Sequence, residues 1–353
     1  MEKKNLIIII TLGVLSALAL ILGLVLGLTI KDDEEKGVLN SYFNTDELIQ
    51  KFKVVHETRV DNGIEKFIQN RLLTGFENWN RGFETWKEWG NILYTPESIY
   101  NVHGARLTLA HYQEDMYDTL GKMKIDMGNF NNMLIVGEYC AIYYDILIRG
   151  RSGTTMEFVQ FKNYKTESDP DVRVVEGWGG VKDDTYYDSI QRQGSAEKKV
   201  QEEQNNFLLT YTPDSSITDL TEKYFVKFTT ANEDDGNYIR DKILAGFDSW
   251  NTGLSEYLDW VDENFSDDAT SKYGDNERNM TQYKEEITKL FESETITKLY
   301  FDNFLIRDDW AAIHYRFRGV DQKNTRTRVG ERMEFFKFEG TGAAKKIVGN
   351  WLK

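Results

Sequence analysis

Apolar residues recur every three or four positions along two stretches of the chain, residues 64–89 and 239–260. This is the spacing of an amphipathic helix that buries one face. A shorter stretch with the same spacing follows each of them, at residues 107–120 and 280–291. The pattern therefore predicts a long helix followed by a short helix, and it predicts this pair twice.

Runs rich in β-branched and aromatic residues follow each pair of helices and are bounded by turn residues. They lie at residues 133–149, 155–162 and 172–178 after the first pair, and at residues 296–305, 310–318, 328–338 and 346–351 after the second. Helices followed by several adjacent strands favour an α+β fold, in which a curved antiparallel sheet carries the helices on one face. We expect this fold in both parts of the chain.

The sequences of the two parts are similar, which indicates an internal duplication. Residues 75–82 are GFENWNRG and residues 246–253 are GFDSWNTG, an offset of 171 positions. Later the offset drifts by a few residues, as loop insertions would cause, and the Met-Glu-Phe of residues 156–158 recurs at residues 333–335. The period is far longer than the 20–50 residues of solenoid repeats, so each copy is predicted to be a domain with its own core.

These patterns divide the chain into five parts. We expect an N-terminal tail and anchor at residues 1–30, an acidic stalk at 31–51, a first domain at 52–180, a polar and partly helical linker at 181–222, and a second domain at 223–353.

Residues 6–30 contain no charged residue. A helix needs about 20 apolar residues to cross a bilayer, whereas the apolar core of a cleaved signal peptide spans roughly 7–15. We therefore predict an uncleaved single-pass transmembrane anchor, with a cleaved signal peptide and a buried core helix as the alternatives. Basic residues are equal in number on the two flanks, and the adjacent Lys3 and Lys4 favour a cytosolic N-terminus. The two domains would then be extracytosolic.

The composition narrows the classes of function. The 353 residues include 43 basic and 58 acidic ones, which gives a net charge of −15. Such a chain is unsuited to nucleic acid, because phosphates require clustered Lys and Arg. A single cysteine, Cys140, excludes an internal disulfide and a cysteine-based zinc site. With no Walker loop, dinucleotide fingerprint or HExxH motif in the sequence, we expect neither a cofactor nor a metal.

The second copy resembles the SnoaL-like branch of the NTF2-like superfamily. Residues 310–319 are similar to the family's penultimate long strand, which ends in a glycine, and residues 332–351 are similar to its closing hairpin, which commonly ends in a tryptophan. In the first copy, residues 94–100 look like the family's short strand after the first helix. The resemblance implies two cone-shaped domains, each a strongly bent sheet around a long helix with an apolar pocket at the open end. It also implies that the domains pair with each other through their sheets.

Glu157 and Glu334 are the leading candidates for catalysis, because they occupy the same place in both copies inside otherwise apolar strands. In the cyclases that the sequence resembles, this position often carries a catalytic Asp. An apolar pocket disfavours the charged carboxylate and so raises its pKa toward the range of a general acid or base. His314 on a neighbouring strand would assist Glu334. The alternative is that strand alternation turns both carboxylates toward solvent.

Three further residues and two glycosylation sequences complete the candidates. Tyr94, Tyr100 and His103 follow the long helix of the first copy and would line the mouth of its pocket, where Tyr100 would assist Glu157. Asn264 and Asn279 each begin an Asn-x-Ser/Thr sequence, and glycosylation at either would agree with an extracytosolic domain.

Two hypotheses about function follow. The favoured one is a membrane-anchored, non-catalytic module that binds a protein partner or a small apolar ligand or takes a structural part in an assembly, because the two copies share no set of His, Asp and Tyr. The alternative is a small-molecule cyclase, isomerase or dehydratase that uses a pocket Glu as general acid or base. Carboxylates deep inside a closed cone favour the enzyme, and carboxylates that face solvent exclude it.

Overall fold

The computed structural model describes residues 43–54, 60, 63–102, 104–118, 125–148, 150–166, 168–179, 190–231, 233–274 and 276–353. The predicted anchor at residues 6–30 and the candidate His103 lie outside these residues. Among the helices of the described part, none combines the length and the apolar character needed to cross a membrane.

The first half begins earlier than the sequence predicts. Helix α2 (Thr45–Lys51), which falls in the expected stalk, is capped by Asn44. Its Leu48 is buried, and its Thr45 accepts a hydrogen bond of 2.8 Å from Asn70 of the next helix. The acidic composition of this stretch conceals a helix that is held by the buried Leu48, by the hydrogen bond from Asn70 and by Lys51, which donates to Glu77 of the same neighbouring helix.

The predicted long helix is two helices in each half. They are α3 (Gly63–Arg81) and α4 (Phe83–Leu93) in the first half, and α9 (Glu233–Thr252) and α10 (Leu254–Asn264) in the second. Gly82 separates the first pair with a φ of 140°, and Gly253 takes the same place in the second pair. Residues with a side chain rarely adopt such a φ, so a glycine allows the chain to turn there. The apolar spacing continues across the break, which is why the sequence reads as one helix.

The first half has a six-stranded sheet. Its strands are β1 (Tyr94–Val102), β2 (Ala105–Thr108), β3 (Ile125–Val136), β4 (Tyr139–Ile148), β5 (Arg151–Asn163) and β6 (Val172–Gly179), in the order β2-β1-β6-β5-β4-β3. Strands β1 and β6 are parallel and the other pairs are antiparallel, so the sheet is mixed rather than antiparallel throughout as predicted. The single strand predicted at residues 133–149 is part of a hairpin, because the chain turns at Gly137 between β3 and β4.

The second half repeats this order. Its strands are β7 (Phe228–Thr230), β8 (Phe265–Tyr273), β9 (Asn276–Asn279), β10 (Glu294–Arg307), β11 (Trp310–Asp321), β12 (Thr327–Glu339) and β13 (Lys346–Leu352), in the order β7-β10-β11-β12-β13-β8-β9. Without the edge strand β7, this is the order of the first sheet read from the other end, with a parallel pair again at β8 and β13. The described chain is therefore an α+β protein with two sheets of matching topology.

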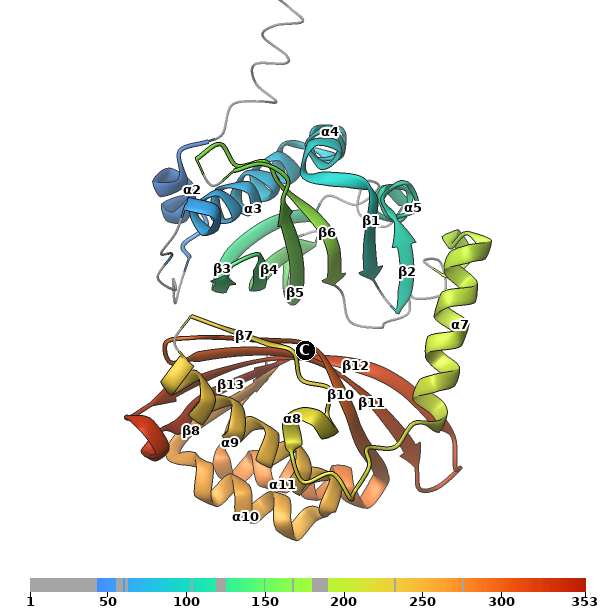
Figure 1. Ribbon diagram of the computed structural model, residues 1–353, viewed down its shortest axis with the longest axis vertical. Helices are drawn as coiled ribbons and strands as arrows, with labels where there is room; N and C mark the ends of the chain where they lie inside the picture. The colour runs from blue at the N-terminus through green and yellow to red at the C-terminus, as the bar shows by residue number, and fades with distance from the viewer. Residues whose placement is uncertain are drawn as a thin grey trace, which may run out of the picture. The chain divides into compact units, whose positions relative to one another are not determined.

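Helices cover one side of each sheet (Figure 1). They include α5 (Leu109–Met116) and α11 (Met280–Ser293), the two predicted short helices, which follow the strands β2 and β9 that the sequence did not predict. In the second half, a cluster of buried aromatic and aliphatic side chains fills the space between helices and sheet. The described part of the linker predicted at residues 181–222 contains α7 (Ser195–Thr210) and the start of α8 (Leu220–Lys223). A short 3₁₀ helix, Gly342–Ala344, precedes β13.

A second apolar cluster joins residues of both sheets. It contains Leu134, Val136, Ala141, Tyr143, Met156, Phe158 and Trp178 of the first half, and Leu305, Trp310, Ala312, Met333 and Phe335 of the second. A buried ion pair also links the halves, because Arg307 Nη2 lies 2.5 Å from Glu65 Oε1 and both side chains are 2% exposed. Residues Asn44–Lys353 accordingly form one compact unit.

Candidate functional site

Each half encloses a cavity between its helices and its sheet, of about 90 Å³ in the first half and about 120 Å³ in the second. One water needs roughly 10–15 Å³ of such space, and a cavity of about 150 Å³ holds benzene. Aromatic and aliphatic side chains make up most of both walls, and one glutamate projects into each cavity, beside Arg328 and Arg332 in the second. These are the two predicted glutamates, Glu157 and Glu334.

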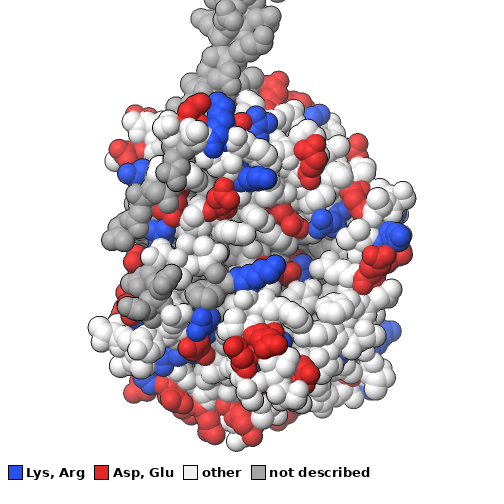
Figure 2. Space-filling view, in the orientation of Figure 1, with Lys and Arg blue, Asp and Glu red and all other residues white. Residues whose placement is uncertain are grey.

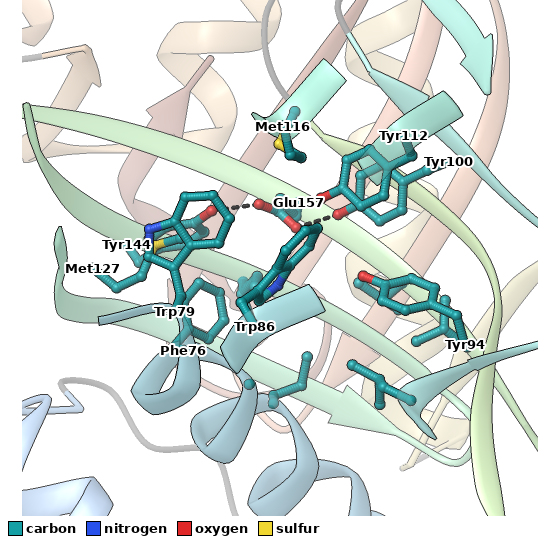
Figure 3. A pocket seen from close by; sticks show the side chains of 16 residues that line it. Phe76, Trp79, Trp86, Tyr94, Tyr100, Tyr112, Met116, Met127, Tyr144 and Glu157 are labelled. Carbon is teal, nitrogen blue, oxygen red and sulfur yellow. Dashed lines mark hydrogen bonds between the residues drawn. The ribbon is translucent and has the colours of Figure 1, made fainter. Parts of the chain in front are cut away.

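Glu157 is held by two tyrosines in the first cavity (Figure 3). The hydroxyl of Tyr100 on β1 donates to one carboxylate oxygen, and the hydroxyl of Tyr144 on β4 donates to the other. Burial raises the pKa of Glu157 above its ordinary value, although the two tyrosine hydrogen bonds act in the opposite direction. Burial raises the pKa of both tyrosines as well, so that they remain donors at neutral pH.

Glu334 has a matching environment in the second cavity, where its side chain is 6% exposed. The hydroxyl of Tyr315 donates to Oε1 at 2.6 Å, and the amide of Asn350 donates to Oε2 at 3.2 Å. Neither glutamate therefore points away from its cavity into bulk solvent, which was the alternative that strand alternation left open.

Tyr144 and Tyr315 occupy equivalent places, which the sequence interpretation missed. Ile142 pairs with Glu157 across β4 and β5, and Ile313 pairs with Glu334 across β11 and β12. The tyrosine two residues after each isoleucine donates to the glutamate in both halves. The signal was present, because these tyrosines are separated by the same 171 positions as the helix motif. The copies therefore share a tyrosine beside the glutamate, although they share no complete set of His, Asp and Tyr.

The second donor differs between the halves, and the difference is compensated. In the first half Tyr100 lies against Gly177, where an added Cβ would come within 2.2 Å of the tyrosine ring. In the second half the register places Ser271 opposite Asn350, at the positions of Tyr100 and Gly177. The smaller serine leaves room for the asparagine, and its hydroxyl donates to Asn350 Oδ1 at 3.2 Å. Each carboxylate consequently keeps two donors, although only one of the two is the same residue type.

The second cavity also contains a buried lysine, Lys298 on β10. Its ammonium lies over four rings, with Nζ-to-centroid distances of 4.1 Å for Phe247, 4.6 Å for Trp250, 5.3 Å for Tyr315 and 5.7 Å for Tyr257. Burial lowers the pKa of Lys298 to about 8, while the charge of Glu334 acts to raise it. The first cavity has no such residue among its described lining residues.

Tyr94 and Tyr100 both line the first cavity, as predicted, but both are buried rather than at a mouth. The ring of Tyr100 stacks on that of Tyr112 of α5, with a centroid distance of 4.2 Å and an interplanar angle of 9°. The helix α5 therefore closes this side of the cavity. His103, the third residue predicted to line this cavity, lies outside the described residues.

His314 does not lie beside Glu334. Ile313 is the residue opposite Glu334, so alternation along β11 directs His314 to the other face of the sheet. There it is fully buried, with its ring centroid 5.8 Å from that of Phe158 of the first half. Its Nε2 lies 3.1 Å from Glu331 Oε2. The histidine thus contacts Glu331 rather than the predicted Glu334, and its ring packs against Phe158 of the apolar cluster shared by the two sheets.

The two glycosylation sequences differ in exposure. Asn264 is 5% exposed, donates to the carbonyl of Trp260 at 2.9 Å, and accepts from Lys242 Nζ at 3.0 Å. This environment has no room for a glycan, so the prediction fails for Asn264 in the folded protein. Asn279 is exposed at the N-terminus of α11, where its side chain caps the helix.

No protein-family model matches the chain, and no curated protein matches its sequence. Solved structures do match. A SnoaL-like polyketide cyclase from Agrobacterium tumefaciens str. C58 is 18% identical, with a TM-score of 0.28, over 33% of this chain and 89% of that one. A ketosteroid isomerase-like protein from Erwinia carotovora atroseptica SCRI1043 is 12% identical, with a TM-score of 0.28, over 34% of this chain and 96% of that one. An NTF2-like protein of unknown function from Cytophaga hutchinsonii ATCC 33406 is 15% identical, with a TM-score of 0.24, over 31% of this chain and 86% of that one.

Proposed function

We propose that the protein is a tandem NTF2-like binding protein, in which the first half takes up a small, largely apolar molecule. The observation that carries the proposal is the carboxylate with two donors inside an aromatic cavity, present in both halves although one donor has changed from Tyr100 to Asn350. A few polar groups fixed in an apolar wall are typical of small-molecule sites. The cavity volumes suit a ligand of only a few heavy atoms.

Binding without catalysis is favoured by the residues around the carboxylates. Of the two described histidines, His111 pairs with Glu197 and His314 packs between the sheets, so neither lines a cavity. The side chain that most often acts as general acid or base is histidine. Here the groups beside Glu157 are tyrosines whose pKa is raised by burial.

A pair of matched variants tests the proposal. Ile142→Phe adds volume to the wall of the first cavity, whereas Ile313→Phe makes the same change at the equivalent position of the second half, outside the lining of its cavity. The full chain, purified in detergent, is denatured, and the small molecules released are identified by mass spectrometry. We expect a molecule that accompanies the wild type and Ile313→Phe and is lost from Ile142→Phe. The proposal is wrong if the same molecules are released from all three, with folding checked by thermal melts.

Acid–base catalysis is the second candidate, and two observations favour it: both carboxylates lie inside a cavity, as expected for an enzyme, and burial raises the pKa of Glu157. The reaction would be a cyclisation, isomerisation or dehydration in which Glu157 moves a proton. Glu157→Gln keeps the size of the side chain and an acceptor for one tyrosine but removes the proton-transferring group. Turnover of the molecule identified above, abolished by Glu157→Gln with binding retained, would establish catalysis. Binding without turnover in the wild type would exclude it for that molecule.

We also propose that residues 6–30 anchor the protein in a membrane with the N-terminus in the cytosol. The support is the uncharged run itself, which is long enough to span a bilayer. On the face shown in Figure 2, Lys and Arg are interspersed with Asp and Glu, which fits a domain held away from anionic lipid and nucleic acid better than one that binds them. Protease protection in sealed vesicles tests the orientation: a protease-accessible C-terminus on the cytosolic side would contradict it.

A further inference from the structure

Aromatic rings at the second cavity, three of them in its lining, show what such a group of rings can hold. Phe247, Trp250, Tyr257 and Tyr315, here called the second cage, surround the ammonium of Lys298 with all four ring centroids within 6 Å. A cation attracts the negative face of an aromatic ring, and the attraction is strongest where water is excluded. With its pKa near 8, Lys298 is mainly protonated at pH 7. The occupant of the second cage is thus an ammonium group supplied by the chain itself.

The first half has the same cage. The four positions 171 residues earlier are Phe76, Trp79, Trp86 and Tyr144, here called the first cage, and all four line the first cavity. Figure 3 shows them close to Glu157.

Three of the four rings are the same residue type in both cages, the fourth is Trp86 in the first and Tyr257 in the second, and the geometry of the rings is retained. Phe76 and Tyr144 have a centroid distance of 4.8 Å at 67°, compared with 4.6 Å at 79° for Phe247 and Tyr315. Trp79 and Trp86 of the first cage have a centroid distance of 5.0 Å and an interplanar angle of 76°. The equivalent Trp250 and Tyr257 of the second cage have 4.8 Å and 74° for the same quantities.

The first cage lacks only the internal cation. Met127 is the counterpart of Lys298, because each exchanges backbone hydrogen bonds with the side chain of the equivalent helix asparagine, Asn80 or Asn251. The strand register agrees, since Met127 pairs with Ile146 and Lys298 with Phe317. Met127 is half-buried and lines the cavity. Four aromatic rings and a carboxylate therefore remain in the first half without the lysine that faces them in the second.

We propose that the first cage binds the cationic group of a small organic ammonium ligand, with Glu157 as its counter-charge, while Lys298 occupies the equivalent site of the second half. The proposal rests on the function proposed above and names the chemical class of the ligand. In the second half, the negative charge of Glu334 acts on the ammonium of Lys298, as the charge of Glu157 would act on the ammonium of the ligand. A cation in the first cavity would lie near the carboxylate and among faces of aromatic rings, two environments that favour positive charge.

The test compares two probes of nearly equal size, tetramethylammonium and tert-butanol, on the detergent-solubilised full chain by isothermal titration calorimetry. Tetramethylammonium should bind with one site per chain and about tenfold or more tighter than the neutral alcohol, which is the discrimination expected for a desolvated cation over aromatic faces. Equal binding of the two probes would overturn the ammonium assignment but leave a small-molecule site. Binding of neither would overturn both proposals.

Two reciprocal substitutions locate the site. Met127→Lys supplies the first cage with an internal ammonium and should abolish tetramethylammonium binding, while a near-native melting curve shows that the fold survives. Lys298→Met empties the second cage and should raise the number of sites from one to two. Unchanged binding in Met127→Lys would place the site elsewhere and refute the proposal. A stoichiometry that stays at one in Lys298→Met would refute the equivalence of the two cages.

Discussion

At the scale of single residues, the two halves hold a carboxylate in the same way and differ in what faces it. The sequence predicted Glu157 and Glu334 because a charged residue inside an apolar strand stands out. It did not predict Tyr144, although the 171-position offset to Tyr315 was visible in the sequence. It did not predict Lys298, because a lysine in a strand has no distinctive pattern until the cross-strand register is known. His314 illustrates the limit, since a one-residue difference in register reverses the face of a side chain.

The affinity of the first cavity for a cation should rise with pH. Burial raises the pKa of Glu157, so below that pKa the carboxyl is neutral and above it the anion attracts the ligand. The titratable groups that face it are Tyr94, Tyr100, Tyr112, Tyr144 and Cys140, which stay neutral at these pH values because burial raises their pKa as well. Titrations with tetramethylammonium from pH 5 to 8 should show this rise in the wild type and a flat, weaker profile in Glu157→Gln. An identical pH profile in the two proteins would contradict the role of Glu157.

Lys298 should make the stability of the protein depend on pH. Its pKa is lowered in the folded state, from an ordinary value of 10.5 to about 8, so the unfolded chain binds more protons between these values and the free energy of unfolding rises with pH. The rise should amount to about 3 kcal/mol relative to Lys298→Met, for which this contribution is absent. Urea unfolding of both proteins at pH 7 and pH 10.5 measures it. A constant difference between the two proteins would show that the lysine is not desolvated.

At the scale of secondary structure elements, periodicity located both pairs of helices and most strands but misplaced their ends. The break at Gly82 was hidden because the apolar spacing runs through it, and the hairpin of β3 and β4 was read as one strand because Gly137 alone marks its turn. Helix α2 was assigned to the stalk because its acidic residues outweigh one buried leucine. Local patterns thus identify the elements, while tertiary contacts set their limits.

Close packing of the long helices predicts an asymmetry between two equivalent glycines. A Cβ at Gly246 would come within 2.4 Å of the Trp260 ring, whereas one at Gly75 would meet Trp89 at 3.3 Å. Gly246→Ala should therefore lower the free energy of unfolding by about 1–3 kcal/mol through overpacking. Gly75→Ala should be near neutral, because the gain in helix propensity of about 1 kcal/mol offsets the tighter contact. Chemical denaturation compares them, and equal effects would contradict this description of the packing.

At the scale of the whole molecule, the sequence predicted the duplication and the α+β class, since both follow from repeated patterns. It could not predict the ion pair of Glu65 and Arg307, because nothing local relates two residues 242 positions apart. The apolar cluster shared by the sheets and this ion pair lead us to propose that the two halves pair as a dimer within one chain. A binding half and a half whose site is filled by its own lysine would then support each other's fold.

The ion pair offers a test of that coupling. Arg307→Met removes the cation that Glu65 contacts and should lower the free energy of unfolding by about 3–5 kcal/mol, since the buried carboxylate keeps the backbone N–H of Gly137 at 2.9 Å but loses the charge of Arg307. Adding Glu65→Gln should restore much of the loss. Differential scanning calorimetry of the full chain should show one transition in the wild type and a second, earlier one in Arg307→Met. Two transitions already in the wild type would mean that the halves unfold independently.

The central claim is that the first cavity is a site for a small cation, and the most direct measurement is a crystal structure with tetramethylarsonium, whose arsenic scatters anomalously. The prediction is an anomalous peak among Phe76, Trp79, Trp86 and Tyr144, with none in the second cage, where Lys298 already lies. An empty first cavity, or a peak of equal height in both cages, would contradict it.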